Sequence, residues 1–265
     1  SVGRDKEQPL AGLRRMSYVI AVAGKGGVGK STLSALLVRA LSERAGEIVL
    51  AVDADPNANL GDKLGVKVER TIGQLREDLL KRADEISGGG SKQDAVMYQL
   101  RLAMMEGEKF DLVTMGRQEG RGCYCYINNL LRTFLDEVMD SYRYVVIDNE
   151  AGMEHLSRRT CQRMDMLVVV SDPTAVGLTT ARRILELAKE MEVQFAHSML
   201  VISRTGDGLP DTLFKAVEEA GFESWTMLPY DERVEELAVA GRPLTELPRK
   251  SKAAAAVLEI AEQMR

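Results

Sequence analysis

Short, uninterrupted runs of apolar residues recur along the chain, and amphipathic stretches separate them. The runs span residues 18–23, 48–52, 112–115, 144–147, 166–170, 199–202 and 225–228. Apolar runs without alternation are typical of strands that are buried on both faces of a sheet. The stretches between them include 31–45, 128–139, 179–191 and 211–220, and their apolar residues follow helical spacing. The pattern predicts a doubly wound α/β fold, in which helices flank both faces of a mostly parallel sheet of about seven to eight strands.

Two segments interrupt this alternation. Residues 71–105 are polar with a helical pattern and contain the break Gly-Gly-Gly-Ser-Lys at 88–92, which predicts an insertion at the rim of the sheet. Residues 116–129 are rich in Gly and Arg and predict a long loop, a kind of segment that often carries function. Met16 and Ser17 directly precede the first apolar run and are expected to be the native start. We therefore expect residues 1–16 to be an extension and residues 17–265 to form a single domain.

Charge and composition limit the classes of partner. The 265 residues include 35 Lys and Arg against 40 Asp and Glu, a net charge of −5, so no overall basic field would hold nucleic acid or an anionic membrane. No apolar run approaches the roughly 20 residues of a membrane span, and residues 1–15 lack the apolar centre of a signal peptide. The three cysteines form no disulfide framework, which fits a reducing compartment. We expect a cytoplasmic protein with no membrane anchor and no nucleic-acid partner.

Residues 24–31, Gly-Lys-Gly-Gly-Val-Gly-Lys-Ser, fit the pattern of a phosphate-binding loop. They follow an apolar run and open a helical stretch, where backbone N–H groups and the helix N-terminus can surround phosphates. Lys30 is expected to hold the outer phosphates, and the Ser31 hydroxyl to bind Mg²⁺. The expected nucleotide contacts in this segment are Gly24, Lys25, Gly26, Gly27, Val28, Gly29, Lys30, Ser31 and Thr32.

Lys25, directly after the first glycine, makes this loop resemble the deviant Walker A phosphate loop of the SIMIBI-class ATPases. That class includes the MinD and Mrp proteins and the nitrogenase iron protein. In these proteins the extra lysine reaches the nucleotide that is bound to the partner subunit. The resemblance therefore implies an enzyme that hydrolyses ATP to ADP and phosphate as a homodimer, with Lys25 and Lys30 both serving catalysis.

Two further segments are similar to the nucleotide switches of the same class. Val-Asp-Ala-Asp-Pro-Asn at 52–57 resembles the first switch, which implies that Asp55 positions the attacking water and that Asp53 lies near the metal. The apolar run 144–147 ends in Asp148, a carboxylate that suits Mg²⁺ binding. The residues after it resemble the second switch, with the Gly152 N–H group near the γ-phosphate.

The base contacts depart from the pattern of the class. Many relatives place an Asn after the sixth strand, often followed by Lys, whereas this chain has Ser203 and Arg204. Ser203 can still donate and accept a hydrogen bond, so adenine remains the expected base. Pro229, Tyr230 and Asp231 resemble the segment that packs against the adenine ring.

Cys123 and Cys125 lie two residues apart in the predicted loop. In an extended segment such residues point to the same side. Two thiolates are too few for a closed tetrahedral site, which takes four, but a two-fold dimer doubles their number. Neighbouring Arg117 and Arg121 favour the thiolate form. The pair predicts a soft-metal site that Cys123 and Cys125 of both subunits share.

The run Gly-Cys-Tyr-Cys at 122–125 and the run Glu-Ala-Gly-Met-Glu-His-Leu-Ser-Arg at 150–158 resemble the CooC family of nickel-insertion ATPases. These proteins mature carbon monoxide dehydrogenase, and the similar AcsF proteins serve acetyl-CoA synthase. The similarity covers residues 17–265. It implies that the paired cysteines hold Ni²⁺, for which Zn²⁺ can substitute, and that a nickel metalloenzyme such as carbon monoxide dehydrogenase or acetyl-CoA synthase receives the metal.

Other functions remain open on the sequence alone. A carrier of an iron–sulfur cluster, or a reductase-like ATPase with a bridging cluster, could also use two cysteines from each subunit. A MinD- or ParA-like positioning ATPase usually needs a terminal amphipathic helix or a basic patch, and residues 247–265 are alanine-rich and weakly amphipathic.

Overall fold

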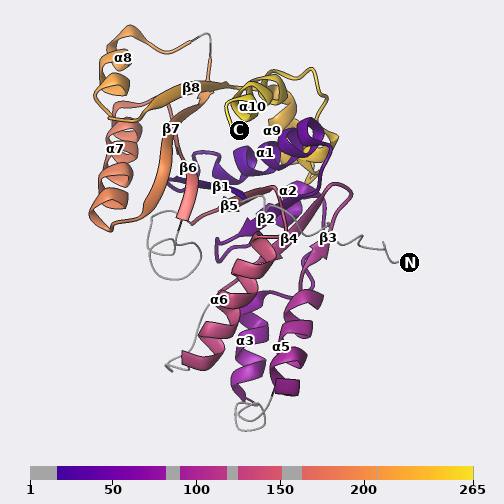
Figure 1. Cartoon of the computed structure of the whole chain (residues 1–265). Helices are drawn as coiled ribbons and strands as arrows, with labels where there is room; N and C mark the ends of the chain where they lie inside the picture. The colour runs from indigo at the N-terminus through magenta and orange to yellow at the C-terminus, as the bar shows by residue number, and fades with distance from the viewer. Residues whose placement is uncertain (1–16, 82–89, 118–124, 151–162, 207, 265) are drawn as a thin grey trace.

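A computed structural model of the chain describes residues 17–81, 90–117, 125–150, 163–206 and 208–264 (Figure 1). The strands in these residues form one eight-stranded sheet in the order β3-β4-β2-β5-β1-β6-β7-β8. Only the two-residue strand β3 is antiparallel to its neighbour, β4. The strands are β1 (Tyr18–Gly24), β2 (Val49–Asp53), β3 (Met105–Glu106), β4 (Phe110–Thr114), β5 (Tyr144–Asp148), β6 (Arg163–Ser171), β7 (Gln194–Thr205) and β8 (Ser224–Pro229).

Helices cover both faces of this sheet, which confirms the predicted doubly wound, mostly parallel fold. One face packs against α1 (Lys30–Ala45), α2 (Leu60–Leu64), α9 (Glu232–Val239), the 3-10 helix η2 (Leu244–Glu246) and α10 (Lys252–Glu262). The other face packs against α3 (Ile72–Lys81), α5 (Gly90–Leu102), α6 (Cys125–Met139), α7 (Ala175–Glu190) and α8 (Asp211–Glu218).

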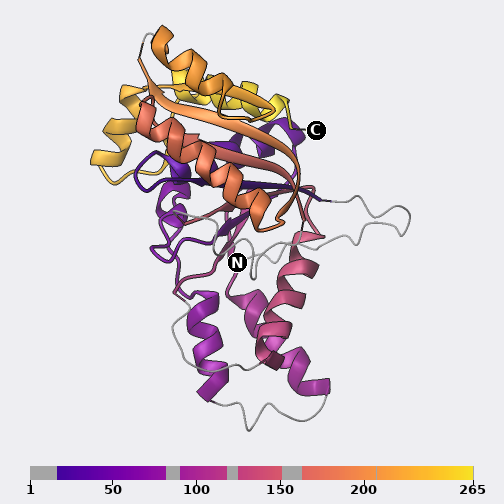
Figure 2. The same cartoon turned by 90° about the vertical axis from the view of Figure 1, so that its left-hand side faces the viewer.

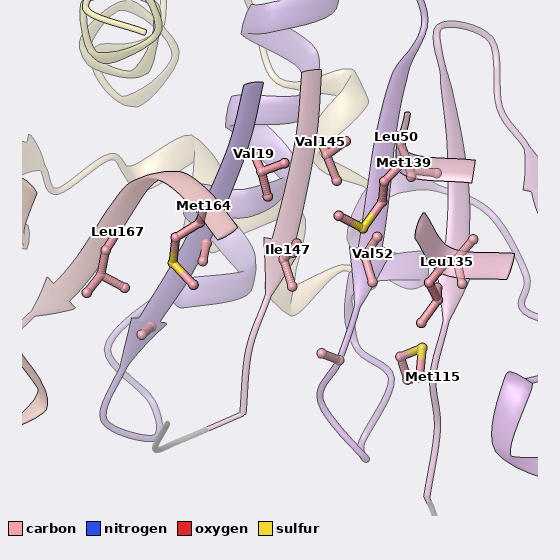
Figure 3. Close-up of a cluster of buried hydrophobic side chains, with 14 of the residues drawn as sticks. Val19, Leu50, Val52, Met115, Leu135, Met139, Val145, Ile147, Met164 and Leu167 are labelled. Carbon is pink, nitrogen blue, oxygen red and sulfur yellow. The ribbon is translucent and has the colours of Figure 1, made fainter. Parts of the chain in front are cut away.

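Each central strand contributes side chains to both faces, so the molecule has two buried clusters. Figure 3 shows the cluster on the α6 face, where Val145 and Ile147 of β5 lie among side chains of β1, β2 and α6. The alternate residues Tyr144 and Val146 belong to the cluster on the α1 face. Burial on both faces explains why these strands are continuous apolar runs in the sequence.

Three helices form a lobe that extends away from the sheet. Both views show α3, α5 and α6 side by side beyond the strand layer (Figures 1 and 2). The lobe contains the predicted insertion, but the extent of the predicted glycine break at 88–92 is wrong, because α5 already begins at Gly90. Val96 and Leu100 of α5 are buried in the core, and this packing outweighs the weak helix propensity of its first residues.

The predicted loop at 116–129 is also shorter than expected at its end. Helix α6 begins at Cys125, three residues before the predicted helical stretch. Leu130 and Phe134 anchor α6 in the core of the α6 face. One of the two paired cysteines is therefore a helix residue, and Cys123 lies outside the described residues.

Candidate functional site

The phosphate loop joins the end of β1 to the start of α1, and its glycines are needed where they stand. Gly27 and Gly29 have φ values of 80° and 98°, a region that other residues rarely adopt. A Cβ atom on Gly24 would lie 2.4 Å from the carbonyl oxygen of Val170 in β6. Gly29 precedes α1 and has no side chain to cap it, so the first N–H groups of the helix face an anion site.

The two lysines of the loop lie in different surroundings. Lys30 is only 7% exposed, and its Nζ donates a hydrogen bond to the carbonyl oxygen of Lys25 at 3.1 Å. This bond holds the ammonium group within the loop. The side chain of Lys25 is exposed to solvent.

Asp148, at the end of β5, has one oxygen bonded and one without a partner. Its Oδ1 accepts a hydrogen bond from Ser34 Oγ of α1 at 3.0 Å. Its Oδ2 is buried and has no hydrogen-bond partner among the described residues. Burial raises the pKa of Asp148, and hydrogen bonds from Ser31 and Ser34 oppose that rise.

Asp53, at the end of β2, is a second buried carboxyl group next to Asp148. The two residues are register partners in neighbouring strands. Asp53 Oδ1 accepts from the Asp55 N–H group at 3.1 Å, and Oδ2 accepts from the Leu60 N–H group at 2.9 Å. Burial raises the pKa of Asp53 to about 7, and the nearby charge of Asp148 adds to the rise.

The Ser31 hydroxyl and these two carboxyl groups fit a magnesium ion. All are hard oxygen donors, which Mg²⁺ prefers. Asp148 Oδ2 is a buried acceptor without a partner among the described residues, and such an atom is costly to leave unsatisfied.

Asp55 lies beyond β2 in a tight turn at the mouth of the site. Its Oδ1 accepts from the Asn57 N–H group at 2.8 Å, and its carbonyl oxygen accepts from the Ala58 N–H group at 3.0 Å. Ala58 has a φ of 53°, an unusual conformation for a residue with a side chain. The turn therefore fixes Asp55 beside the phosphate loop.

These elements surround a cleft of 1040 Å³, which is large enough for a nucleotide. The predicted residues Gly26, Gly27, Gly29, Lys30, Ser31, Thr32, Asp55 and Arg204 line it. Gly24 and Val28 are buried in the strand end and loop below.

Sequence reasoning missed the wall opposite the phosphate loop. This wall comes from α2 with the turn after it and from the connection between α9 and η2, and it includes Asn59, Asp62, Lys63, Gly65, Val66, Lys67, Ala238, Gly241, Arg242 and Pro243. Gly65 and Pro243 bring the two parts together, because a Cβ on Gly65 would lie 3.0 Å from Pro243 Cβ. The sequence of this wall contains Gly, Lys and Arg residues. Their spacing matches no known motif, so it did not predict a binding site.

Four residues predicted to contact the base lie outside the lining of this cleft. Ser203 is 2% exposed, and its Oγ lies 2.6 Å from the carbonyl oxygen of Val28 and 3.1 Å from that of Ser171. It therefore supports the phosphate loop from below. Pro229 ends β8, and the hydroxyl of Tyr230 bonds to Glu235.

Asp231 connects two helices. Its Oδ1 accepts from the Arg233 N–H group in the first turn of α9 at 3.0 Å. Its Oδ2 accepts from the Ala253 N–H group in the first turn of α10 at 2.9 Å. Both carboxylate oxygens are thus used to hold α9 and α10 in place.

The remaining predicted site residues lie at the limits of the described ranges or outside them. Gly152 and Cys123 lie outside them, and Cys125 is the first residue of α6. Within the described ranges no group of three or more His, Cys, Asp or Glu side chains gathers as a metal site. No helix of the described part is long and apolar enough to cross a membrane.

Comparison with known proteins identifies the fold and the cleft. The family description CobQ/CobB/MinD/ParA nucleotide binding domain matches residues 19–244. The chain belongs to this family. It is an ATPase of the superfamily that includes MinD, ParA and the nitrogenase iron protein.

Relatives span most of the chain. It is 43% identical to an uncharacterized ATP-binding protein of Methanocaldococcus jannaschii over 93% of this chain and 98% of that protein. It is 36% identical to the carbon monoxide dehydrogenase accessory protein CooC of Rhodospirillum rubrum over 66% of this chain and 70% of that protein. The fold matches a ParA family ATPase of Chlorobium tepidum with a TM-score of 0.71 at 20% identity, over 95% of this chain and 100% of that chain.

Proposed function

We propose that this ATPase forms a homodimer around its nucleotides and inserts nickel into a metalloenzyme of the carbon monoxide dehydrogenase type. The observation that carries the proposal is the 36% identity to the accessory protein CooC. The cysteine pair supports it, because Cys123 and Cys125, the first residue of α6, would supply two soft ligands from each subunit.

The cleft residues have separate roles in the hydrolysis of ATP. Lys30 and the N–H groups of the loop bind the outer phosphates, and we propose that the Gly152 N–H group joins them. Ser31, Asp53 and Asp148 would hold Mg²⁺, which when bound neutralises charge on the outer phosphate oxygens. Adenine is the expected base. Arg204, which the sequence predicted as a base contact, lines the same cleft as the phosphate loop.

Asp55 is proposed to orient the attacking water. Its Oδ1 is held by the Asn57 N–H group, and its Oδ2 bonds to no described residue. A water that bonds to this oxygen can attack the γ-phosphorus, and the bond from that phosphorus to the β-phosphate oxygen breaks to give ADP and phosphate.

Dimerisation would bring the metal ligands together. The exposed Lys25 is able to contact the nucleotide of a partner subunit. Cys123 and Cys125 of both subunits would then supply the four thiolates of a tetrahedral site for Ni²⁺ or Zn²⁺ on the two-fold axis. In this proposal the metal is the cargo and leaves by ligand exchange with the acceptor enzyme.

A transfer experiment tests this function. The wild-type chain is loaded with radioactive nickel under anaerobic conditions and mixed with nickel-free carbon monoxide dehydrogenase, with ATP, with ADP or without nucleotide. We expect nickel to appear in the enzyme fastest with ATP and to be lost in the variant Cys123→Ser/Cys125→Ser. The matched control Cys161→Ser should transfer nickel as the wild type does. Equal transfer by the double variant would refute nickel insertion through this pair.

A second candidate is a carrier of an iron–sulfur cluster, because four thiolates across a dimer axis also suit a [4Fe–4S] cluster. Visible absorbance of the protein after anaerobic purification, which the double variant lacks, would favour this function. A colourless protein that binds nickel would exclude it.

A further inference from the structure

Helix α2 holds one lysine at the wall opposite the phosphate loop. Leu60 and Leu64 of this short helix are buried in the core on the α1 face. The Leu60 N–H group also bonds to Asp53 at 2.9 Å, which fixes the start of α2 beside the two buried carboxyl groups. Lys63, one turn after Leu60, lines the cleft.

The side chain of Lys63 lies among several charged groups at the cleft. The side chain is half-buried, and this burial lowers its pKa. Among the charges that act on it, Asp148 at the end of β5 has a larger effect than Asp62, its neighbour in α2. No hydrogen bond or ion pair joins Lys63 Nζ to another described residue. A half-buried cation without an acceptor is costly, so the arrangement suits an anionic ligand.

Arg204 adds a second cation to the same cleft. It has a φ of 55° and stands at the irregularity in the pairing of β7 with β8. Bulges of this kind redirect a side chain, and a left-handed conformation in a residue other than glycine is often found at functional sites. Arg204 is near enough to lower the pKa of Lys63. The mutual repulsion of these two cations is relieved when an anion binds between them.

We propose that Lys63 is a further phosphate-binding residue, which contacts the outermost phosphate of the nucleotide on the phosphate loop of its own subunit. Ser31 lines the cleft together with Lys63, and the charge of Asp148 acts on Lys63. In the proposed site Ser31 and Asp148 hold Mg²⁺ beside the outer phosphates, so the outermost phosphate is the part of the nucleotide nearest to Lys63. A contact with the third phosphate is present in ATP and absent in ADP. Lys63 therefore makes the cleft prefer the triphosphate. This inference rests on the ATPase site and is independent of nickel.

Nucleotide binding at equilibrium tests this role. Fluorescent derivatives of ADP and of a non-hydrolysable ATP analogue are titrated with Mg²⁺ into the wild type, Lys63→Met, Lys63→Arg and Lys67→Met. Lys67 is a matched control, because it lines the same wall and its replacement makes the same change in charge. Thermal unfolding of each variant without nucleotide measures whether the substitution disturbs the fold.

The expected result is selective for the triphosphate. Lys63→Met should weaken binding of the ATP analogue about 10-fold or more and change ADP binding less than about 2-fold, because a charge-assisted hydrogen bond to phosphate is lost. Lys63→Arg should recover most of the affinity. Lys67→Met should weaken both nucleotides equally and slightly. Equal losses for ATP analogue and ADP in Lys63→Met, or no loss, would overturn the inference. A wild type that binds neither nucleotide would instead refute the ATPase site itself.

Discussion

The protonation state of the buried Asp53 side chain affects whether the whole site can bind Mg²⁺. Asp53 is fully buried beside Asp148, its two oxygens accept backbone N–H groups, and burial raises its pKa to about 7. In the nucleotide-free protein it is therefore protonated over a range of pH in which an unfolded aspartate is ionised. Mg²⁺ binding requires the ionised form of Asp53. Metal binding, the loss of this proton and the stability of the folded protein are therefore linked.

This coupling predicts a pH dependence of the free energy of unfolding. Between about pH 4 and pH 7 the folded protein binds one more proton at Asp53 than the unfolded chain does, so this contribution to stability is present at low pH and is lost as the pH rises through 7. The loss is on the order of 4 kcal/mol for a pKa change of this size. Asp53→Asn, which cannot titrate, should remove it.

Denaturant unfolding of both proteins without Mg²⁺ or nucleotide, from pH 4.5 to 8, measures the effect. The difference in stability between wild type and Asp53→Asn should change in favour of the variant as the pH rises. Titrating groups that do not interact with Asp53 cancel in this difference. A difference that is constant over the whole range would show that Asp53 is ionised in the folded protein.

At the scale of single residues, the sequence predicted those site residues whose positions follow from backbone geometry. Gly27 and Gly29 need positive φ, and Asp53 and Asp148 end buried strands, so both pairs were recognisable from pattern alone. The hydrogen-bond partners of Ser203 could not be recognised from the sequence. A hydroxyl can bond to a base or to a backbone carbonyl, and the sequence does not distinguish these partners.

At the scale of elements, the second wall of the cleft depends on how α9 and α10 are held. Asp231 caps α9 with one carboxylate oxygen, and its other oxygen accepts the Ala253 N–H group in the first turn of α10, whose own N-cap is Ser251. The residues after α9, including Gly241 and Arg242, line the cleft. We therefore expect Asp231 to act on nucleotide binding through the position of α9, whereas the sequence predicted that it lies in the segment that packs against adenine.

Replacement of Asp231 separates these two roles. Asp231→Ala should destabilise the protein by about 2 kcal/mol, since two hydrogen bonds to N–H groups in first helical turns are lost at about 1 kcal/mol each. Asp231→Asn, which keeps one acceptor oxygen, should lose about half as much. Asp211→Ala at the first residue of α8 removes an acidic side chain from a helix start outside the cleft and should cost under about 1 kcal/mol. Denaturant unfolding measures these changes. Unchanged stability with a loss of nucleotide binding would favour the direct contact with adenine.

Element length decided which elements were predictable. The central strands are uninterrupted apolar runs of four or more residues, and the long helices repeat their apolar positions several times, so both were found. Helix α2 has five residues and β3 has two. Both elements are too short for the helical or the strand repeat of apolar positions to be recognised in the sequence. The start of α6 was placed late, because in the sequence its first turn directly follows Cys123 and Tyr124 and no capping residue precedes it.

At the scale of the whole molecule, the order of the strands in the sheet brings the residues of the site together. The ends of β2, β5 and β1 are adjacent in the sheet, so Asp53, Asp148 and the phosphate loop meet although they are far apart in sequence. The alternation of strand and helix predicted a parallel sheet, but the order of its strands is known only from the structure. The lobe of α3, α5 and α6 follows from packing between distant segments, which no local pattern in the sequence contains.

The central claim is that nucleotide closes a dimer around one metal ion held by the cysteine pair. Anaerobic titration of the wild type and Cys123→Ser/Cys125→Ser with Ni²⁺ and with Zn²⁺, with and without ATP and Mg²⁺, measures metal stoichiometry and molecular mass together. The account predicts about one ion per dimer in the wild type and none in the double variant, which should still hydrolyse ATP. Equal metal binding by both proteins, or binding by neither, would contradict it and leave a dimeric ATPase with another cargo.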